Sequence, residues 1–209
     1  MVGWPKRGKT IRMEALQERA ASNAERDGQL IERLALGDLD AFEAFYKEYR
    51  PKLRGFILNI VSNEEVVDEV FDDVMMVVWT RIASFEGRSK LSTWVFSIAY
   101  RRALKERTRR AGANRVEVEY TDEVAEPEAV EGEAEREVEA GRTRDKIKAA
   151  LKKLPSDQGT VVRLAYFEGL GYRDIGAIME CPEDTVKTRM FHARRKLKAA
   201  LGGTLADWV

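Results

Sequence analysis

Apolar residues recur at every third or fourth position along most of this chain, the spacing that gathers them on one side of an α-helix. The pattern predicts helical segments within residues 28–60, 63–79, 92–110 and 144–201. No stretch alternates apolar and polar residues over the length of a strand, and no internal repeat relates the two halves. We therefore predict an all-α fold.

Turn-forming and capping residues divide the first part of the chain into separate helices. The sequence Gly-Asp-Leu-Asp at 37–40 breaks the apolar period, and either Asp38 or Asp40 would cap the next helix. Pro51 marks a mild irregularity, because the same period resumes immediately after it. The sequence Ser-Asn-Glu-Glu at 62–65 resembles a capping box and predicts a new helix start.

Residues 63–79 are expected to form an amphipathic helix whose polar side carries charges of one sign. The segment contains six carboxylates and no Lys or Arg. Like charges four residues apart destabilise a helix by about 0.2–0.5 kcal/mol per pair, so this face either docks on a basic partner or is a solvated surface without one. One side carries Glu65, Asp68, Glu69, Asp72 and Asp73, and the other carries Val66, Val67, Val70, Phe71, Val74, Val77 and Val78.

A segment rich in aromatic and basic residues follows. After a polar loop at 86–90, residues 99–110 contain six positive charges against one carboxylate. Aromatic rings beside cations suit single-stranded nucleic acid, because bases stack on the rings while phosphates follow the charges. Alternatively, the cations only complement the negative end of a helix. The spacing favours a core position for Trp94, whereas Phe96 and Tyr100 are open to either role.

Residues 111–143 differ sharply from their surroundings. They contain eleven acidic and three basic residues, a net charge of −8, and few large apolar side chains. Such a segment cannot bury enough apolar surface to offset its ordering entropy, so we expect a flexible acidic linker between two helical domains. Residues 1–27 carry few anchoring apolar positions, and we expect a mobile extension there and a short tail at 204–209.

The last part of the chain is predicted to contain a helix-turn-helix unit. Residues 173–179 and 183–201 are two helical segments joined by a short turn. A helix with one apolar stripe and an opposite face of Thr, Lys, Arg and His can enter a major groove and contact base edges and phosphates. The alternative is an ordinary surface helix of a bundle. The apolar stripe comprises Val186, Met190, Ala193, Leu197 and Leu201.

Composition and charge exclude several classes of function. Thirty-six basic residues balance thirty-six acidic ones, so the informative property is the segregation of charge along the sequence. Cys181 and His192 are the only residues of their types, so neither an internal disulfide nor a Cys/His zinc site can form. The carboxylates at 64–73 spread along one helix face, whereas hard cations need converging oxygens. We expect no metal and no other cofactor.

Enzyme and targeting signatures are missing as well. The sequence lacks a Gly-rich phosphate loop and the GxSxG and HExxH motifs. Its apolar runs are far shorter than the roughly 18–20 residues that span a membrane. The basic N-terminus lacks the apolar core of a secretory signal. We expect a cytoplasmic protein that is not an enzyme.

Two blocks of the sequence resemble the extracytoplasmic-function (ECF) sigma factors, the two-domain branch of the main bacterial sigma family. In the first block, AFEAFYKEYRPKLRGFIL, VVDEVFDDVMMVVW and LSTWVFSIAYRRALKERTRR resemble sigma region 2. In the second, LKKLPSDQGTVVRLAYFEGLGYRDIGAIMECPEDTVKTRMFHARRKLKAAL resembles sigma region 4. The two blocks in this order, across an acidic linker, are specific to that family. The resemblance implies a region 2 helical bundle at 28–110 and a region 4 helix-turn-helix domain at 144–203.

The resemblance also implies a partner for each surface. The partner would be core RNA polymerase, through the clamp helices of the β′ subunit, which the acidic face would bind, and through the β subunit. An anti-sigma factor would block these surfaces. The loop and basic helix would melt the −10 promoter element, the last helix would read the −35 element, and the linker would thread through the polymerase. The implied residues are Glu65, Asp68, Glu69, Asp72 and Asp73 for polymerase; Phe85, Arg88, Ser89, Lys90, Trp94, Phe96, Tyr100, Arg101 and Lys105 for the −10 element; and Asp184, Thr185, Lys187, Thr188, Arg189, Phe191, His192, Arg195 and Lys196 for the −35 element.

Several positions depart from the family pattern. Phe71 stands where a Gln is common, Arg101 where an Asn is frequent, Pro182 in place of a Ser, and Phe191-His192 in place of His-Arg. These departures bear on the promoter sequence more than on the function.

A stand-alone helix-turn-helix regulator would account only for the second block, and an adaptor scaffold would leave both basic clusters unexplained. We also expect the free protein to bind DNA poorly, because the acidic linker and the acidic helix compete for its basic helices.

Overall fold

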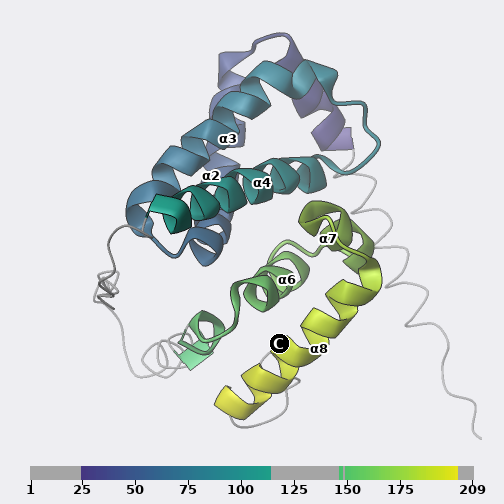
Figure 1. Ribbon diagram of the computed structural model, residues 1–209. Coiled ribbons are helices and arrows are strands. Elements are labelled where there is room, and N and C mark those ends of the chain that lie inside the picture. The colour runs from purple at the N-terminus through teal and green to yellow at the C-terminus, as the bar shows by residue number, and fades with distance from the viewer. Residues whose placement is uncertain (1–24, 114–145, 148, 202–209) are drawn as a thin grey trace, which may run out of the picture.

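The structure is a computed structural model that describes residues 25–113, 146–147 and 149–201, and every regular element in these residues is a helix (Figure 1). The prediction of an all-α fold is therefore confirmed. The N-terminal extension to residue 24, the acidic linker from residue 114 and the tail predicted at 204–209 lie outside the described residues.

The first group of helices forms a bundle around large apolar side chains. Its largest fully buried residues include Phe45, Phe56, Phe71 and Phe96, and each long helix packs on the other two. The bundle thus has an aromatic core of its own, which holds the surfaces of α3 and α4 in fixed positions. Its elements are a helix at 25–35, α2 (Leu39–Val61), η1 (Glu64–Val66), α3 (Val67–Arg81), η2 (Ile82–Ser84) and α4 (Leu91–Ala113).

The helix starts follow from local capping. Of the two candidate caps for α2, the structure selects Asp38, whose Oδ1 accepts a 3.0 Å hydrogen bond from Ala41 N. α2 continues through Pro51 without a break. The predicted capping box is wrong in detail: Ser62 ends α2 at a φ of 54°, and Asn63 Oδ1 accepts from Glu65 N to start the 3₁₀ turn η1. α3 begins only at Val67.

The second group contains the predicted helix-turn-helix. After helical residues at 146–147 and 149–152, its elements are α6 (Ser156–Tyr166), α7 (Tyr172–Met179) and α8 (Glu183–Leu201). A β-carbon at Gly176 would lie 2.8 Å from Cys181 O, so the turn between α7 and α8 closes only because that residue is glycine. Val186, Met190, Ala193 and Leu197 of the predicted stripe are buried, and Leu201 is partly buried.

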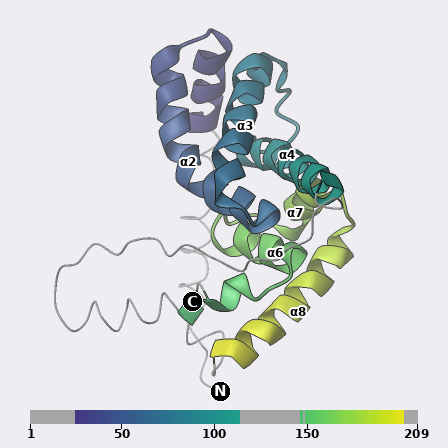
Figure 2. The same cartoon turned by 60° about the vertical axis from the view of Figure 1, so that its left-hand side comes forward.

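The two groups pack against each other. α2 contacts α6 and α4 contacts α7, so the helix-turn-helix unit lies directly beside α4 (Figures 1 and 2). The buried apolar residues of both groups join in one continuous cluster. This contact between the two groups was not predicted from the sequence.

Candidate polymerase and nucleic-acid interfaces

The acidic side of α3 and the turn before it faces outward. Glu65, Asp68, Glu69, Asp72 and Asp73 are all exposed. The opposite side packs into the bundle. Met75, which was not predicted to be buried, is buried there, whereas Val77, which was, is only partly buried. The buried residues of α3 are Val67, Val70, Phe71, Val74, Met75 and Val78.

Phe71, the departure from the family pattern on this helix, belongs to the core. It is fully buried, and its ring meets the edge of Tyr46 with centroids 5.0 Å apart. Phe71 therefore leaves the acidic face unchanged, because it points into the bundle rather than toward a partner.

Some of the acidic charge of this face is balanced inside the domain. Asp68 forms an ion pair with Arg54 of α2, and Asp73 Oδ2 lies 3.3 Å from Arg102 Nη1 of α4. By contrast, Glu65, Glu69 and Asp72 have no ion pair with any residue that the structure describes. Glu69 and Asp72 are three residues apart on one side of α3, and Glu65 precedes them in η1; we call these three residues the acidic stripe. The exposed Met76 continues this stripe at its C-terminal end.

The loop before α4 exposes polar and basic side chains beside two aromatic rings. Phe85 and Trp94 are partly buried, and their ring centroids lie 5.4 Å apart. Arg88, Ser89 and Lys90 are exposed at the tip of the loop. The loop thus combines accessible cations with an aromatic pair at its base.

Two aromatic residues predicted to contact DNA do not lie on an open surface. Phe96 is fully buried, edge-on to Phe56 with centroids 5.0 Å apart, so it is a core residue in this structure. Tyr100 is only 7% exposed, and burial raises the pKa of its hydroxyl. Both corrections arise because α4 is covered on two sides, by α2 and α3 on one and by α7 on the other.

The cations of α4 are largely paired. Arg109 and Arg110 both donate hydrogen bonds to Glu106. These bonds lower the pKa of that carboxyl to about 2, and Arg109 contributes most. Arg101 Nη1 lies 3.4 Å from Glu180 Oε1 of the second group. Lys105 is exposed and has no ion pair in the described part of the chain. The basic surface available on α4 is therefore smaller than the sequence predicts.

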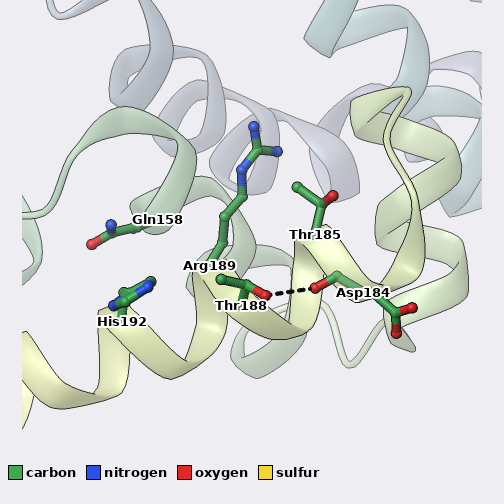
Figure 3. A pocket seen from close by; sticks show the side chains of 6 residues that line it. All are labelled: Gln158, Asp184, Thr185, Thr188, Arg189 and His192. Atoms are coloured by element: carbon green, nitrogen blue, oxygen red, sulfur yellow. Dashed lines mark hydrogen bonds between the residues drawn. The ribbon is translucent and has the colours of Figure 1, made fainter.

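The outer face of α8 carries most of the residues predicted to read duplex DNA. Thr185, Arg189 and His192 are partly buried around an open hollow of about 330 Å³. Figure 3 shows Gln158 of α6 on the far side of this hollow, near His192. The sequence did not single out Gln158, because its place beside α8 depends on tertiary packing. The exposed members of the set are Asp184, Lys187, Thr188, Phe191, Arg195 and Lys196.

Local contacts distinguish the side chains of α8. Arg189 donates to Asp157 Oδ2 at 2.6 Å, so it ties α8 to α6 instead of extending into solvent. Lys187 bonds to Glu183 and Asp184, which raises its pKa. Arg195 and Lys196 are exposed and have no ion pair among the residues described. Both are therefore accessible for phosphate contacts.

Two further properties concern metals and membranes. Within residues 25–113 and 146–201, apart from 148, no three His, Cys, Asp or Glu side chains are grouped so that they could hold a metal ion. None of the helices in the same residues combines the length and the apolar character needed to cross a bilayer.

Sequence and structure comparisons agree on the family. Residues 45–112 match the model of sigma-70 region 2, and residues 144–197 match that of sigma-70, region 4. The chain is 33% identical over 191 residues to the RNA polymerase sigma-H factor of Pseudomonas aeruginosa, covering 88% of this chain and 97% of the relative. It is 30% identical over 177 residues to the ECF RNA polymerase sigma-E factor of Haemophilus influenzae, covering 82% and 93% of the two chains.

Solved structures of sigma factors have a similar fold. The sigma factor RpoE of Bartonella quintana, in complex with the anti-sigma factor NepR, has a TM-score of 0.61 and 27% identity, with coverage of 76% of this chain and 97% of that one. CnrH, in complex with the cytosolic domain of CnrY, shares the fold at a TM-score of 0.56 and 22% identity, over 84% and 96% of the two chains. The chain therefore belongs to the ECF sigma factors, and it binds core RNA polymerase and promoter DNA to direct promoter-specific transcription initiation.

Proposed function

We propose that this sigma factor uses three separate surfaces for its three macromolecular contacts. The acidic stripe of α3 binds polymerase, the loop 85–91 with α4 holds the opened −10 element, and α8 reads the −35 duplex. The observation that carries the proposal is the division of chemistry along one chain. α3 and the turn before it carry carboxylates without an ion pair among the described residues, the start of α4 and its loop carry aromatic rings beside exposed cations, and α8 carries hydroxyls with exposed cations.

The polymerase contact is assigned to the carboxylates of η1 and α3 that form no ion pair within the described residues. Glu65, Glu69 and Asp72 form the stripe, and Asp68 and Asp73 flank it while paired with Arg54 and Arg102. A single-sign stripe speeds association with a basic surface and selects its orientation. The exposed Met76 at the end of the stripe adds apolar area, which a docking surface needs beyond charge.

The −10 contact is assigned to the loop and the exposed side of α4. Arg88, Ser89 and Lys90 would follow the phosphates of the displaced strand, and the Phe85–Trp94 pair offers ring surface for an unstacked base. Arg101 and Lys105 extend this surface along the helix, and Tyr100 is left out of it because it is buried. Phe96 is left out of the surface, because it supports Phe56 in the core.

The −35 contact is assigned to the outer face of α8. Thr185, Lys187 and Thr188 lie in its first two turns, where a groove-inserted helix reaches base edges. Asp184 and His192 line the hollow beside this face, and the Phe191 ring packs against that of His192. Arg195 and Lys196 would contact phosphates, and Arg189 would hold the helix at its angle to α6.

The remaining parts of the proposal extend the family's properties to this chain. The acidic linker, which lies outside the described residues, would thread through the polymerase. An anti-sigma factor is proposed as a regulator, because the solved relatives were obtained in complex with NepR and with CnrY. The protein would act in the cytoplasm, where polymerase and promoters are, and would itself catalyse no reaction.

Transcription in vitro with core polymerase from the same host tests the proposal. The chain should form a stable holoenzyme and start transcription at defined sites on a promoter library. A stand-alone helix-turn-helix regulator would instead bind duplex operators without polymerase and give no transcripts with core enzyme. Failure to bind core polymerase, with the protein folded and free of inhibitors, would reject the proposed role of α3.

A further inference from the structure

We propose that the −35 element presents amino groups and a thymine methyl group to the outermost side chains of α8, where a more basic recognition helix would select guanine. The inference rests on the proposed function, which assigns the −35 duplex to this helix, and it names the base chemistry that the helix selects. It follows from three side chains that together offer no free hydrogen-bond donor. They are Asp184, Thr188 and Phe191, which we call the outer ridge.

The outer ridge lies on the side of α8 opposite its buried stripe, which comprises Val186, Met190, Ala193 and Leu197. At about 100° per residue, all three side chains fall within about 50° of the direction opposite that stripe, whereas Lys187 lies about 90° from it. Exposure agrees with this register, because the side chain of Asp184 is 91% exposed and Phe191 is 63% exposed. A helix held by its buried stripe therefore inserts the outer ridge deepest into a groove.

The length of the outer ridge matches a short run of base pairs. Asp184 and Phe191 are seven positions apart in α8, about 10 Å along the axis at roughly 1.5 Å per residue. Base pairs stack about 3.4 Å apart, so the ridge spans about three steps, and it fits a major groove about 12 Å wide. Arg195, on the same side, lies about 6 Å further along and keeps its phosphate contact. The ridge is therefore the part of this side that faces base edges.

Both polar members of the outer ridge can only accept hydrogen bonds. An ionised carboxylate has no proton to donate, and Lys187 Nζ lies 3.1 Å from Asp184 Oδ1, which leaves Oδ2 for a base. The Thr188 hydroxyl donates its single proton to Asp184 O at 2.9 Å, as Figure 3 shows, so only its lone pairs are free. Two successive turns of the helix therefore present acceptors to the groove.

The major groove offers few partners for such acceptors. Guanine N7 and O6 and thymine O4 are themselves acceptors, whereas the amino groups at adenine N6 and cytosine N4 are the donors on base edges. Each base pair carries one of these amino groups, on one strand only. A ridge oxygen that meets an acceptor loses its hydration without a new hydrogen bond, so the ridge rejects G and T on the strand that it faces and favours A or C there.

Phe191 supplies apolar surface to the same ridge. Its exposed ring packs against that of His192 with centroids 5.5 Å apart. The thymine methyl group is the apolar group that base pairs present in the major groove. An exposed ring among base edges therefore favours thymine at a third position.

A purely structural role for the two carboxylates of the first turn predicts a different result. Glu183 and Asp184 both lie at the positive end of the α8 dipole, and each pairs with Lys187 at 3.1 Å. If these contacts were their whole role, the two carboxylates would be equivalent. Glu183, however, lies about 130° from the direction opposite the buried stripe, so Asp184 alone of the two faces the groove. Glu183 is therefore a matched control.

Selection from a promoter library tests the base preference of the outer ridge. The probe is a promoter with a randomised upstream element, transcribed by holoenzyme that contains the full chain. The wild type should enrich A or C at two positions of one strand and T at a third, within about three steps. Asp184→Asn should admit G and T at the first of these positions, because an amide nitrogen donates to O6 or O4, and a preference of about tenfold should be lost there.

Glu183→Gln frees Lys187 from one carboxylate in the same way and should leave the upstream element unchanged. The inference is overturned if Asp184→Asn changes no position, or if Glu183→Gln gives the same change. Enrichment of no upstream element by the wild type would reject the proposed role of α8 together with this inference. An upstream element that Asp184→Asn leaves intact would reject the inference alone.

Replacement of thymine by uracil tests the third contact without changing base pairing. The probes are the selected promoter with thymine or uracil at the position that Phe191→Ala alters in the selection, each competing for the same holoenzyme. The wild type should prefer thymine about fourfold, the value of one methyl group removed from water, and Phe191→Ala should show no preference. Phe167→Ala, which removes a 60% exposed ring of region 4 outside α8, should keep the preference. Equal binding of both probes by the wild type, or an unaltered selection by Phe191→Ala, would overturn the contact with thymine.

Discussion

Arg189 of the recognition helix donates a 2.6 Å hydrogen bond to the Asp157 carboxylate of α6. Its other terminal nitrogen lies 3.5 Å from Cys181 Sγ in the turn. A residue that the sequence assigned to base reading thus holds the angle between two helices of its domain. Arg189 therefore sets the position of α8, whereas exposed side chains such as Arg195 extend toward DNA.

Asp157→Asn should therefore destabilise region 4 modestly. Both partners are partly exposed, so solvent screens the pair, and we expect a loss of about 0.5–1 kcal/mol in the free energy of unfolding. Urea denaturation followed by circular dichroism measures this loss. Asp184→Asn is the control, because Asp184 is 91% exposed and should have almost no effect. Equal losses in the two variants would contradict the positioning role.

Charge reversal on α3 should weaken polymerase binding. Asp72→Lys reverses an exposed carboxylate of the stripe without breaking an ion pair among the described residues, so the fold should be preserved. We expect at least a loss of about tenfold in affinity for core polymerase, because a like charge meets a basic surface. Adding Asp68→Lys should weaken binding further. Co-purification with core enzyme and circular dichroism are the measurements.

The control for this reversal is Glu32→Lys, which makes the same charge change at an exposed position of the helix spanning 25–35. It should leave polymerase binding unchanged. If Asp72→Lys also co-purifies fully with core polymerase, the stripe is a solvated face, the alternative that the sequence left open.

Removal of a phosphate contact on α8 should weaken binding evenly across DNA sequences. Arg195→Ala and Lys196→Ala should each lower the slope of log affinity against log salt for −35 duplex by about one, because each releases about one counterion less. Titrations at several salt concentrations measure the slope. Lys47→Ala on α2 should leave it unchanged. A loss confined to one base position would instead assign the residue to base reading.

The Glu106 cluster predicts an acid-dependent stability for the end of α4. Its hydrogen bonds with Arg109 and Arg110 hold the pKa of the Glu106 carboxyl at about 2, below its ordinary value of 4.5. Because the folded pKa is the lower one, the stabilisation is fully present above pH 4.5 and is lost as the pH falls toward 2.

Glu106→Gln should therefore reduce the free energy of unfolding at pH 7, and its difference from the wild type should shrink steadily below pH 4.5. Denaturation at a series of pH values measures this convergence. Glu32→Gln, at an exposed position, should follow the wild type throughout. A difference that stays constant down to pH 2 would show that the carboxylate is not held by the two arginines.

The spacing of apolar residues predicted the helices and most of their buried positions, because a helix that buries one side repeats its apolar residues every three or four positions. The stripe of α8 and the buried side of α3 follow that rule. α4 does not, since it is covered by its own bundle and by α7, and burial on two sides removes the contrast that would have marked Phe96 and Tyr100 as buried.

The pairing of polar and charged side chains was beyond prediction for a related reason. Arg102 with Asp73 and Asn59 with Thr160 join residues that are distant in sequence and leave no periodic signal. Acidic residues pair with cations of α4 and the loop before it at Asp73, Asp174 and Glu180, whereas the acidic linker that we expected to compete lies outside the described residues. Two of these three acids come from region 4, a source that the sequence did not indicate.

Selection of promoters from a randomised library, by transcription with core polymerase, tests the division of surfaces most directly. The wild type should enrich two elements at a fixed spacing. Thr188→Ala should alter only the upstream element, and Lys90→Ala only the downstream one. Enrichment of no common element, or a change in the upstream element caused by Lys90→Ala, would contradict the account.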